Sequence, residues 1–234
     1  MKTIVVSLGG SIVVPSLDSH HIQEYAAVLR ELASRYRVLV VVGGGGEARR
    51  YITVARDLGI DDATADDIGI LVTRLNAALI TGALGDAAYP RVAETYQDAR
   101  EYAEAGKIVV IGGLIAGQTT DAVAAVLAEY THAAALFNVT SVDGIYSADP
   151  RKDPRAVRHE HLTPAQLMTV VQKNQLVAGS NTVFDIVAAK VVERSGVPLF
   201  VLDGKDPRTL RDAILDGRFI GTVVCEGPAL RLPL

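Results

Sequence analysis

Hydrophobic residues in this chain gather in short runs rich in Val and Ile, and Gly, Asp or Pro bounds each run. Runs of this length and composition predict buried β-strands. We expect strands at Thr3–Leu8, Val38–Val42, Lys107–Ile111, Ala134–Val139, Val197–Leu202 and Ile220–Cys225. Because the runs are apolar throughout rather than alternating, they favour a mainly parallel sheet that helices cover on both faces.

The segments between these runs have the periodicity of helices. We expect helices at Asp18–Arg35, Glu47–Leu58, Ile68–Leu84, Thr120–Tyr130, Pro164–Lys173, Asp185–Ser195 and Pro207–Asp216. Two of the starts carry caps, a capping box from Thr163 to Gln166 and an Asp206 before Pro207. The alternation of strand and helix predicts an α/β fold. No composition break marks a linker, so residues 1–234 are expected to form one domain with two halves.

Three glycine clusters directly follow three of the predicted strands. They are Gly9-Gly10-Ser11, the run Gly43 to Gly46, and Gly112-Gly113 with Gly117 close behind. The carboxyl ends of parallel strands meet at one edge of a sheet, so the clusters are expected to share one crevice. Glycine lets backbone N–H groups approach an anion, and the start of a following helix adds partial positive charge. One cluster alone is typical of a tight turn, but three together favour a phosphate site.

Two common nucleotide-binding patterns fit the sequence less well. The second cluster with Glu47-Ala48 matches G-x-G-x-x-A, but residues 57–84 predict helix, turn and helix instead of the second strand that a dinucleotide-binding domain needs. The Walker pattern is absent, since neither Gly106-Lys107 nor Gly204-Lys205 has the upstream glycine or the following hydroxyl. An ordinary P-loop enzyme is excluded.

Longer motifs resemble the amino acid kinase superfamily, and within it the archaeal type of uridylate (UMP) kinase. They are Leu8 to Ser11, Gly43 to Arg49, Asp66 to Asn76, Thr119 to Ala125 and Val142 to Pro150. The resemblance spans nearly the whole chain, and its last two motifs are long enough to be specific. It implies a three-layer α/β/α sandwich whose N-terminal half binds the phosphate acceptor and whose C-terminal half binds ATP. It also implies reversible transfer of the ATP γ-phosphate to UMP, giving UDP and ADP in pyrimidine nucleotide biosynthesis.

The same resemblance implies roles for single residues, with Gly10 and Arg49 as the catalytic ones. The ATP side comprises Gly9, Gly10, Gly45, Arg49, Thr140, Tyr146 and Asp149. The UMP side comprises Gly44, Asp66, Leu114, Ile115, Ala116, Gly117, Gln118, Thr119 and Thr120. For Arg49, physical chemistry agrees, because phosphoryl transfer needs positive groups and a guanidinium can grip phosphate through two N–H groups. The neighbouring Arg50 is expected on a solvated face.

Some of these residues also have a purely structural interpretation. Asp66 or Asp67 could cap a helix that begins near Ile68, and Thr119-Thr120-Asp121 would form a good capping sequence for the next one. A short carboxylate in the crevice can also accept both hydroxyls of a ribose. We therefore expect one of the two aspartates to cap and the other to bind the acceptor.

Two positions depart from the wider superfamily. Many members carry a lysine two residues before the Gly pair, where this chain has Ser7, and part of the transition-state charge is left unassigned. Acetylglutamate-type members carry a second lysine where this chain has Asp185, so the acetylglutamate and carbamate kinase interpretations weaken. Lys152 is a candidate donor. We expect Mg²⁺, bound with ATP, to neutralise much of the transition-state charge, and we assign it no protein ligand.

Composition excludes several classes of protein and partner. The 234 residues are 49% hydrophobic and 21% charged with a net charge of −4, so disorder is ruled out and no field attracts nucleic acid or an anionic membrane. The single Cys225 cannot form an internal disulfide, and His159-x-His161, expected on one face of a strand and at the surface, lacks a third ligand, so no metal site is expected. Gly9-Gly10 interrupts the apolar N-terminus, which argues against an export signal. We expect a cytoplasmic protein outside the membrane.

Two alternatives to a UMP kinase stay open on the residues alone. One keeps the fold but changes the acceptor to an isopentenyl-phosphate-type molecule or a carboxylate. The other is a non-catalytic nucleotide-binding storage or assembly protein. The resemblance further implies a homo-oligomer, typically a hexamer, and the apolar helix at Ile68–Leu84 is a candidate interface, although burial within the monomer explains its composition equally well.

Overall fold

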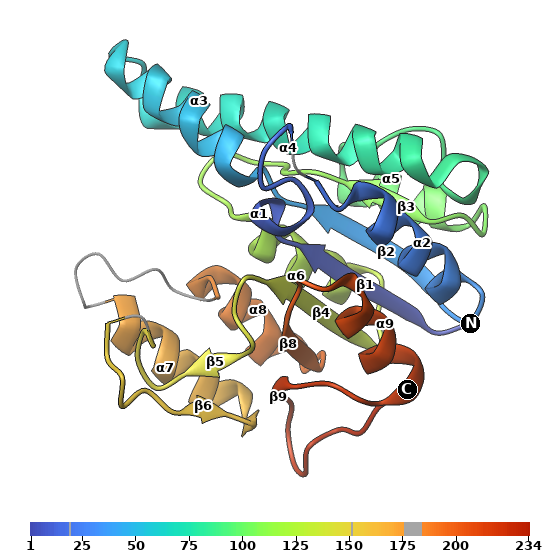
Figure 1. Ribbon diagram of the computed structural model, residues 1–234, viewed down its shortest axis with the longest axis vertical. Helices are drawn as coiled ribbons and strands as arrows, with labels where there is room; N and C mark the ends of the chain where they lie inside the picture. Colours follow the sequence, from blue (N-terminus) through green and yellow to red (C-terminus); the bar gives the residue numbers. More distant parts are fainter. Residues whose placement is uncertain (19, 151, 176–183) are drawn as a thin grey trace.

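All six apolar runs form strands of one sheet in the computed structural model, which describes residues 1–18, 20–150, 152–175 and 184–234. The sheet has seven strands in the order β3-β2-β1-β4-β8-β9-β7 (Figure 1). They are β1 Thr3–Leu8, β2 Arg37–Val42, β3 Val109–Ile111, β4 Ala135–Thr140, β7 His161–Leu162, β8 Leu199–Asp203 and β9 Gly221–Val224. Among these described strands every neighbouring pair is parallel except β8 with β9, so the prediction of a mainly parallel sheet is confirmed.

Helices cover both faces of this sheet. They are α1 Gly10–Val13, α2 Ile22–Ala33, α3 Gly45–Asp57, α4 Asp62–Leu84, α5 Tyr96–Ala103, α6 Thr120–Tyr130, α7 Pro164–Gln175, α8 Ile186–Ser195 and α9 Pro207–Asp216, with a 3₁₀ turn at Gly85–Ala87. Along β1, Ile4, Val6 and Leu8 pack into a core with α2, α4 and α9, whereas Val5 packs into a second core with α5 to α8. The predicted three-layer sandwich is confirmed, with α3 lying outside it along α4 (Figure 1).

Helix starts follow the predicted caps in most places. At α7 the N–H of Thr163 donates to Gln166 Oε1 at 2.8 Å and the N–H of Gln166 donates to Thr163 Oγ1 at 3.2 Å, which confirms the capping box. Asp206 caps α9 as predicted. Asp185 caps α8 by accepting from the N–H of Ala188 at 2.9 Å. Its carboxylate therefore has a structural use in this fold.

The start of α4 differs from the prediction. The helix begins at Asp62, and Asp61 is its N-cap because the Asp61 carboxylate accepts a hydrogen bond from the N–H of Thr64 at 3.0 Å. Asp66 and Asp67 lie inside the helix, so the prediction that one of them caps it is wrong. The polar first turns carry no apolar periodicity, which is why the pattern placed the start near Ile68. Similarly, α2 begins at Ile22 rather than Asp18.

Several short elements were not predicted. Helix α5 is mostly polar and buries only Ala99 and Ala103, too few for a periodic signal. Strands β5, Ile145–Tyr146, and β6, Arg158–His159, form a separate antiparallel hairpin. His161 lies in β7 of the main sheet, so the prediction that both histidines share one strand face is wrong, and both are partly buried rather than at the surface. The described residues contain no group of three His, Cys, Asp or Glu side chains that could bind a metal.

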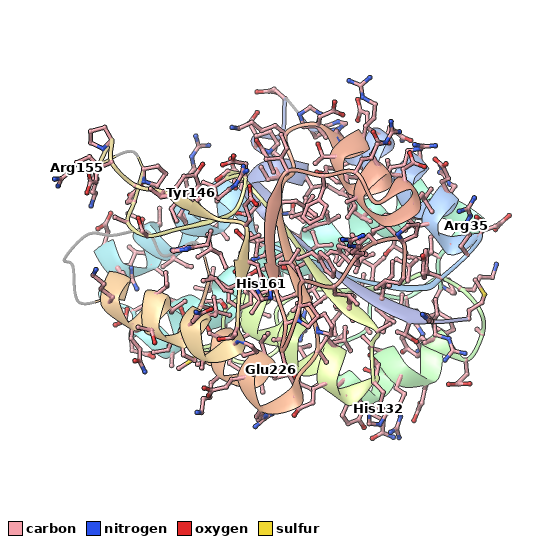
Figure 2. The ribbon with its side chains drawn as sticks, turned by 90° about the horizontal axis from the view of Figure 1, so that it is seen from below. Arg35, His132, Tyr146, Arg155, His161 and Glu226 are labelled. Carbon is pink, nitrogen blue, oxygen red and sulfur yellow. The ribbon has the colours of Figure 1, made fainter. Side chains whose placement is uncertain are left out.

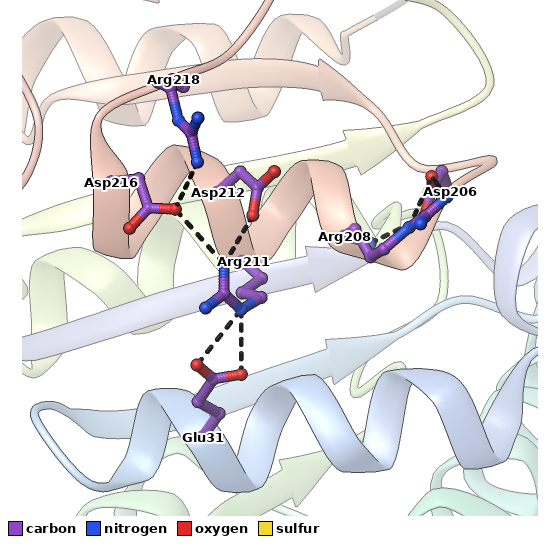
Figure 3. A network of polar contacts seen from close by, with 7 residues as sticks. All are labelled: Glu31, Asp206, Arg208, Arg211, Asp212, Asp216 and Arg218. Atoms are coloured by element: carbon purple, nitrogen blue, oxygen red, sulfur yellow. Dashed lines mark hydrogen bonds and ion pairs between the residues drawn. The ribbon is translucent and has the colours of Figure 1, made fainter.

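An ion-pair network joins the C-terminal helix α9 to α2 (Figure 3). Arg211 on α9 lies 3.0 Å from the Glu31 carboxylate on α2 and also contacts Asp212 and Asp216. Arg218 completes the network through Asp216 at 2.9 Å. All these side chains are partly exposed, so the network contributes little to stability, and the apolar core beneath it carries the packing of the two helices.

Candidate functional site

The carboxyl ends of β1, β2 and β4 open into a cavity of about 470 Å³. The three glycine clusters meet there, as the topology of the sheet requires. Residues with a predicted site role that line the cavity are Gly9, Gly10, Gly44, Gly45, Arg49, Asp66, Ile115, Gly117, Gln118, Thr119, Thr120 and Thr140. Lining residues without a predicted role are Ser11, Gly43, Ala48, Ile52, Gly69, Ile70, Thr73, Gly113, Asp121 and Asn138. The volume suits a small-molecule ligand.

The first two glycine loops touch each other at the mouth of this cavity. A Cβ atom on Gly10 would overlap the backbone of Gly43 and Gly45, so no other residue fits there. Gly45 has a φ of +67°, a conformation that L side chains rarely adopt. The N–H of Gly9 donates to the carbonyl of Val139 at 2.9 Å, which ties the first loop to the end of β4. The loops therefore present backbone rather than side chains to a ligand.

Helix α4 holds two of the loops in place through buried polar side chains. Asn76 Nδ2 donates to the carbonyl of Gly43 at 2.9 Å and to that of Gly44 at 3.3 Å. One turn earlier, Thr73 Oγ1 accepts from the N–H of Gly113 at 2.6 Å. These two residues were missed by the sequence reasoning. The signal that would have found them is a pair of polar residues, three positions apart, on the buried face of an apolar helix.

Asp66 connects α4 to the loop before α6. Its Oδ2 accepts a hydrogen bond from the N–H of Gly117 at 2.8 Å. Gly117 has a φ of +79°, so this loop turns at a residue for which glycine is favoured. Asp66 is half-buried while its neighbour Asp67 is exposed. Asp66 therefore lies in the cavity wall, and one carboxylate oxygen is already bound to the loop.

Arg49 and Arg50 differ in their surroundings although they are adjacent on α3. Arg49 lines the cavity, close to the start of a helix whose N-terminus adds partial positive charge. Arg50 forms an ion pair with Glu47 at 2.9 Å. No carboxylate among the described residues pairs with Arg49. The guanidinium of Arg49 is thus available for an anion in the cavity.

The floor of the cavity is a polar cluster in which Asn138 and Asp121 line the cavity and Ser7 lies behind them. Ser7 on β1 and Asn138 on β4 are paired in register, and each is 2% exposed. Ser7 Oγ donates to Asp121 Oδ1 at 3.0 Å. Burial raises the pKa of Asp121 to about 6, with a further rise from Asp185, while the Ser7 and Asn138 side chains lower it. The sequence analysis placed Asp121 in a helix-capping sequence and gave it no role in the site.

Four predicted site residues and the candidate donor Lys152 do not line the cavity. The residues are Leu114, Ala116, Tyr146 and Asp149. Leu114 packs against the core on the α6 face of the sheet. Tyr146 lies on the β5–β6 hairpin, on the side of the molecule opposite His132 (Figure 2), and its hydroxyl donates to Asp143 Oδ1 at 2.8 Å.

A second cavity of about 470 Å³ lies beside this hairpin. Its lining residues are Asp143, Asp203, Asp206, Arg208, Thr209, Asp212, Arg218 and Ile220. Thr140, in the wall of the first cavity, is paired in register with Asp203, in the wall of the second. The carboxyl end of β4 therefore separates two adjoining cavities, one rich in glycine and one rich in charged side chains.

Comparison with known protein families shows which family this chain belongs to. The model of the amino acid kinase family matches residues 2–203. The chain belongs to the amino acid kinase family. A uridylate kinase of Methanoculleus marisnigri is 61% identical over 233 residues, with all of both chains covered, and one of Methanocorpusculum labreanum is 54% identical over 235 residues with the same coverage. The crystal structure of uridylate kinase from Archaeoglobus fulgidus matches with a TM-score of 0.86 at 41% identity, covering 96% of this chain and 100% of that one.

Membership of this family agrees with the position of the cavity. In an open α/β sheet the ligand crevice lies outside the carboxyl ends of the strands, and the glycine loops of this amino acid kinase family member lie there. The fold and family that the motifs resemble are therefore confirmed.

Proposed function

We propose that this member of the amino acid kinase family transfers the γ-phosphate of ATP to UMP, giving ADP and UDP for pyrimidine nucleotide biosynthesis. The UMP kinase prediction agrees with relatives named uridylate kinase that match over their full length. The observation that carries the proposal is the convergence of the glycine loops, Arg49 and Asp66 on one cavity. Backbone N–H groups and a guanidinium suit phosphates, and a carboxylate suits ribose hydroxyls.

The reaction asks the protein for positioning and charge rather than for proton transfer. An oxygen of the UMP phosphate attacks the γ-phosphorus in line, and ADP leaves. The attacking phosphate has a second pKa of about 6 and is largely ionised at neutral pH, so no general base is assigned. Gly10 lets the two loops approach, and Arg49 neutralises charge on the phosphoryl oxygens. The two groups are the proposed catalytic residues.

The two substrates are assigned to opposite ends of the cavity. UMP would lie between Gly44, Asp66 and the stretch 114–120, where the Asp66–Gly117 hydrogen bond already joins two of these parts. The ATP phosphates would lie under Gly9, Gly10 and Gly45. Thr140 then leads toward the second cavity, so the adenosine would extend past Thr140 to the side where Tyr146 holds Asp143. The charged lining of that cavity supports a polar occupant.

Mg²⁺ is proposed to enter with ATP. Mg²⁺ prefers oxygen ligands and is commonly held by one or two carboxylates together with substrate phosphates and water. The cavity floor offers the Asp121 carboxylate and the side-chain oxygen of Asn138, Thr140 adds an oxygen in the wall, and this donor set fits the ion. When bound, Mg²⁺ supplies positive charge to the phosphate oxygens. The backbone loops and Arg49 supply the rest.

For assembly we propose a homo-oligomer, a hexamer, formed through α4. The outer face of α4 exposes Leu71, Leu75 and Leu79 at 59%, 64% and 48%, while Ala77 and Ile80 on its inner face are buried. Among the described residues, one helix, Asp62–Ala87, is long and apolar enough to cross a membrane. Core helices of soluble proteins meet the same criteria of length and composition. Covering the apolar face of α4 with a second copy of the chain is the simpler explanation for this helix.

The proposed location is the cytoplasm, where the free, buried Cys225 stays reduced.

The test of function is a coupled assay of ADP release with a panel of acceptors. We expect turnover with UMP to exceed turnover with isopentenyl phosphate and with small carboxylates. Turnover with another acceptor alone would retain the kinase and reject UMP. Nucleotide binding without turnover on any acceptor would reject the enzyme and favour a storage or assembly protein.

A further inference from the structure

Asn138 is a buried cavity residue whose side-chain N–H groups make no hydrogen bond to the described residues. It lies on β4, is 2% exposed and lines the cavity. Its Nδ2 is buried and has no hydrogen-bond partner among the described residues. Burying an unpaired donor destabilises a folded chain, so native structures rarely keep one without a reason. A ligand that accepts a hydrogen bond from the amide would supply that reason.

The packing around Asn138 places it next to the proposed phosphate loop. Its register partner on β1 is Ser7, two residues before Gly9. The next residue along β4, Val139, accepts the hydrogen bond from the N–H of Gly9. Asn138 therefore lies beneath the loop assigned to the ATP phosphates.

Within the floor cluster of Ser7, Asn138 and Asp121, the donor role is left to Asn138. The hydroxyl of Ser7 already donates to Asp121. Arg49 is the one Lys or Arg side chain among the described residues that line the cavity, and it comes from α3 rather than from the floor. With a serine at position 7, no lysine rises from β1 to meet a phosphoryl group. The floor then has one donor group that is not already in use, Nδ2 of Asn138.

The alternative is a purely structural role, in which the Asn138 amide holds the Asp121 carboxylate in place. The amide of Asn138 is close enough to act on that carboxylate, but no hydrogen bond of normal geometry joins them. Ser7 already fixes Asp121 from the β1 side. A structural role therefore leaves the amide without a normal hydrogen bond, whereas a charged phosphate oxygen offers it a strong acceptor.

We propose that Asn138 is a catalytic residue whose side-chain amide donates a hydrogen bond to an oxygen of the phosphoryl group being transferred. The inference rests on the proposed function. The bond from the γ-phosphorus to the bridging oxygen of ADP breaks, the bond to the UMP phosphate oxygen forms, and Asn138 keeps both its protons. Negative charge spreads over the equatorial oxygens in the transition state, so a fixed donor there lowers the barrier more than it tightens ground-state binding.

The experiment measures catalysis, binding and stability on Asn138→Leu, which has a similar volume and no donor. We expect kcat with ATP and UMP to fall about ten- to hundredfold, as for the loss of a hydrogen bond to a charged group. KM for both substrates and the calorimetric Kd for Mg-ADP should change less than about threefold. The Tm should stay level or rise, because an unpaired buried amide has been removed.

Thr222→Val is the matched control for a buried polar group that does have partners. Thr222 is fully buried, accepts from the N–H of Ile145 at 2.8 Å and donates to the carbonyl of His159 at 2.5 Å. Its loss should lower the Tm and leave kcat of the folded enzyme within about twofold. Asn138→Ala repeats the kinetic comparison in case the leucine does not fit.

The outcomes separate a catalytic role from a structural one. A kcat within about twofold of the parent in both Asn138 variants would overturn the proposal. So would a Tm loss like that of Thr222→Val, with kcat and both KM values changing together. If the parent turns over another acceptor instead of UMP, the proposed function fails while the same comparison on that acceptor still decides the role of Asn138. If the parent turns over none, both fail.

Discussion

The Asp66 carboxylate accepts a hydrogen bond from the N–H of Gly117 at 2.8 Å, across 51 residues of sequence. This contact joins the long helix α4 to the loop that precedes α6. It uses Oδ2 and leaves Oδ1 for a ligand. Because Asp61, not Asp66, caps α4, the Asp66 carboxylate has no duty in starting the helix. The contact therefore links the two proposed halves of the UMP pocket.

Replacing Asp66 tests the assignment of this pocket to UMP. In Asp66→Asn the side-chain oxygen can still accept from Gly117, but the charge that strengthens hydrogen bonds to ribose hydroxyls is lost. We expect KM for UMP to rise about tenfold and KM for ATP to change less than about twofold, with a larger rise for UMP in Asp66→Ala. Steady-state kinetics with each substrate varied measures both. The exposed Asp67→Asn is the control and should match the parent. Equal changes in the two KM values would remove Asp66 from the acceptor site.

Arg49→Ala tests the proposed contact between the Arg49 guanidinium and the phosphoryl oxygens. We expect kcat to fall by a factor of about ten or more with little change in Tm, because an exposed arginine in the cavity contributes charge rather than packing. Arg50→Ala is the matched control one residue away, where the ion pair with Glu47 faces solvent and contributes little. Kinetics and melting curves on both variants provide the comparison. Equal kcat values for the two variants would contradict the role given to Arg49.

Leu75→Glu tests the proposed interface on α4. Leu75 is 64% exposed in the single chain, so a glutamate there should not disturb the monomer, but it would place a charge in an apolar contact between copies. We expect light scattering to show an oligomer for the parent and a smaller species for the variant. Val157→Glu is the control, since Val157 is 65% exposed on the connection that leads into β6. A monomeric parent at working concentration would reject the interface.

The outline of the fold was predictable because it depends on local patterns. The apolar strands pair in register from β3 to β9, and the carboxyl ends of parallel strands bring the glycine clusters to one edge whatever the loops do. The start of α4 was missed because the polar turn Asp62–Asp67 carries no apolar period and Asp61 competes for the cap. Helix α5 was missed because it buries only two alanines.

The floor of the site was not predictable from the sequence pattern. Ser7 and Asp121 are 114 residues apart and meet only because α6 packs over β1. Asn138 is one polar residue in an apolar strand, and its partner strand and its exposure are known only from the tertiary structure. Asn76 and Thr73 likewise gain their role from loops that lie far away in sequence. Sequence pattern predicts which residues are unusual, and only the packing shows what each one faces.

The Asp121 carboxyl predicts a specific dependence of stability on pH. Burial raises its pKa from 3.8 to about 6, so between these values the folded chain binds a proton that the unfolded chain has lost. The free energy of unfolding must then fall as pH rises through this range, and the cost of the buried charge persists above it. Asp121→Asn removes the titration while its side-chain oxygen can still accept from Ser7. We expect the variant to be more stable than the parent by about 3 kcal/mol at pH 7.5, and the difference to vanish below about pH 4. Urea unfolding of both proteins at four pH values measures it, and a difference that does not vary with pH would show that burial leaves this carboxyl unperturbed.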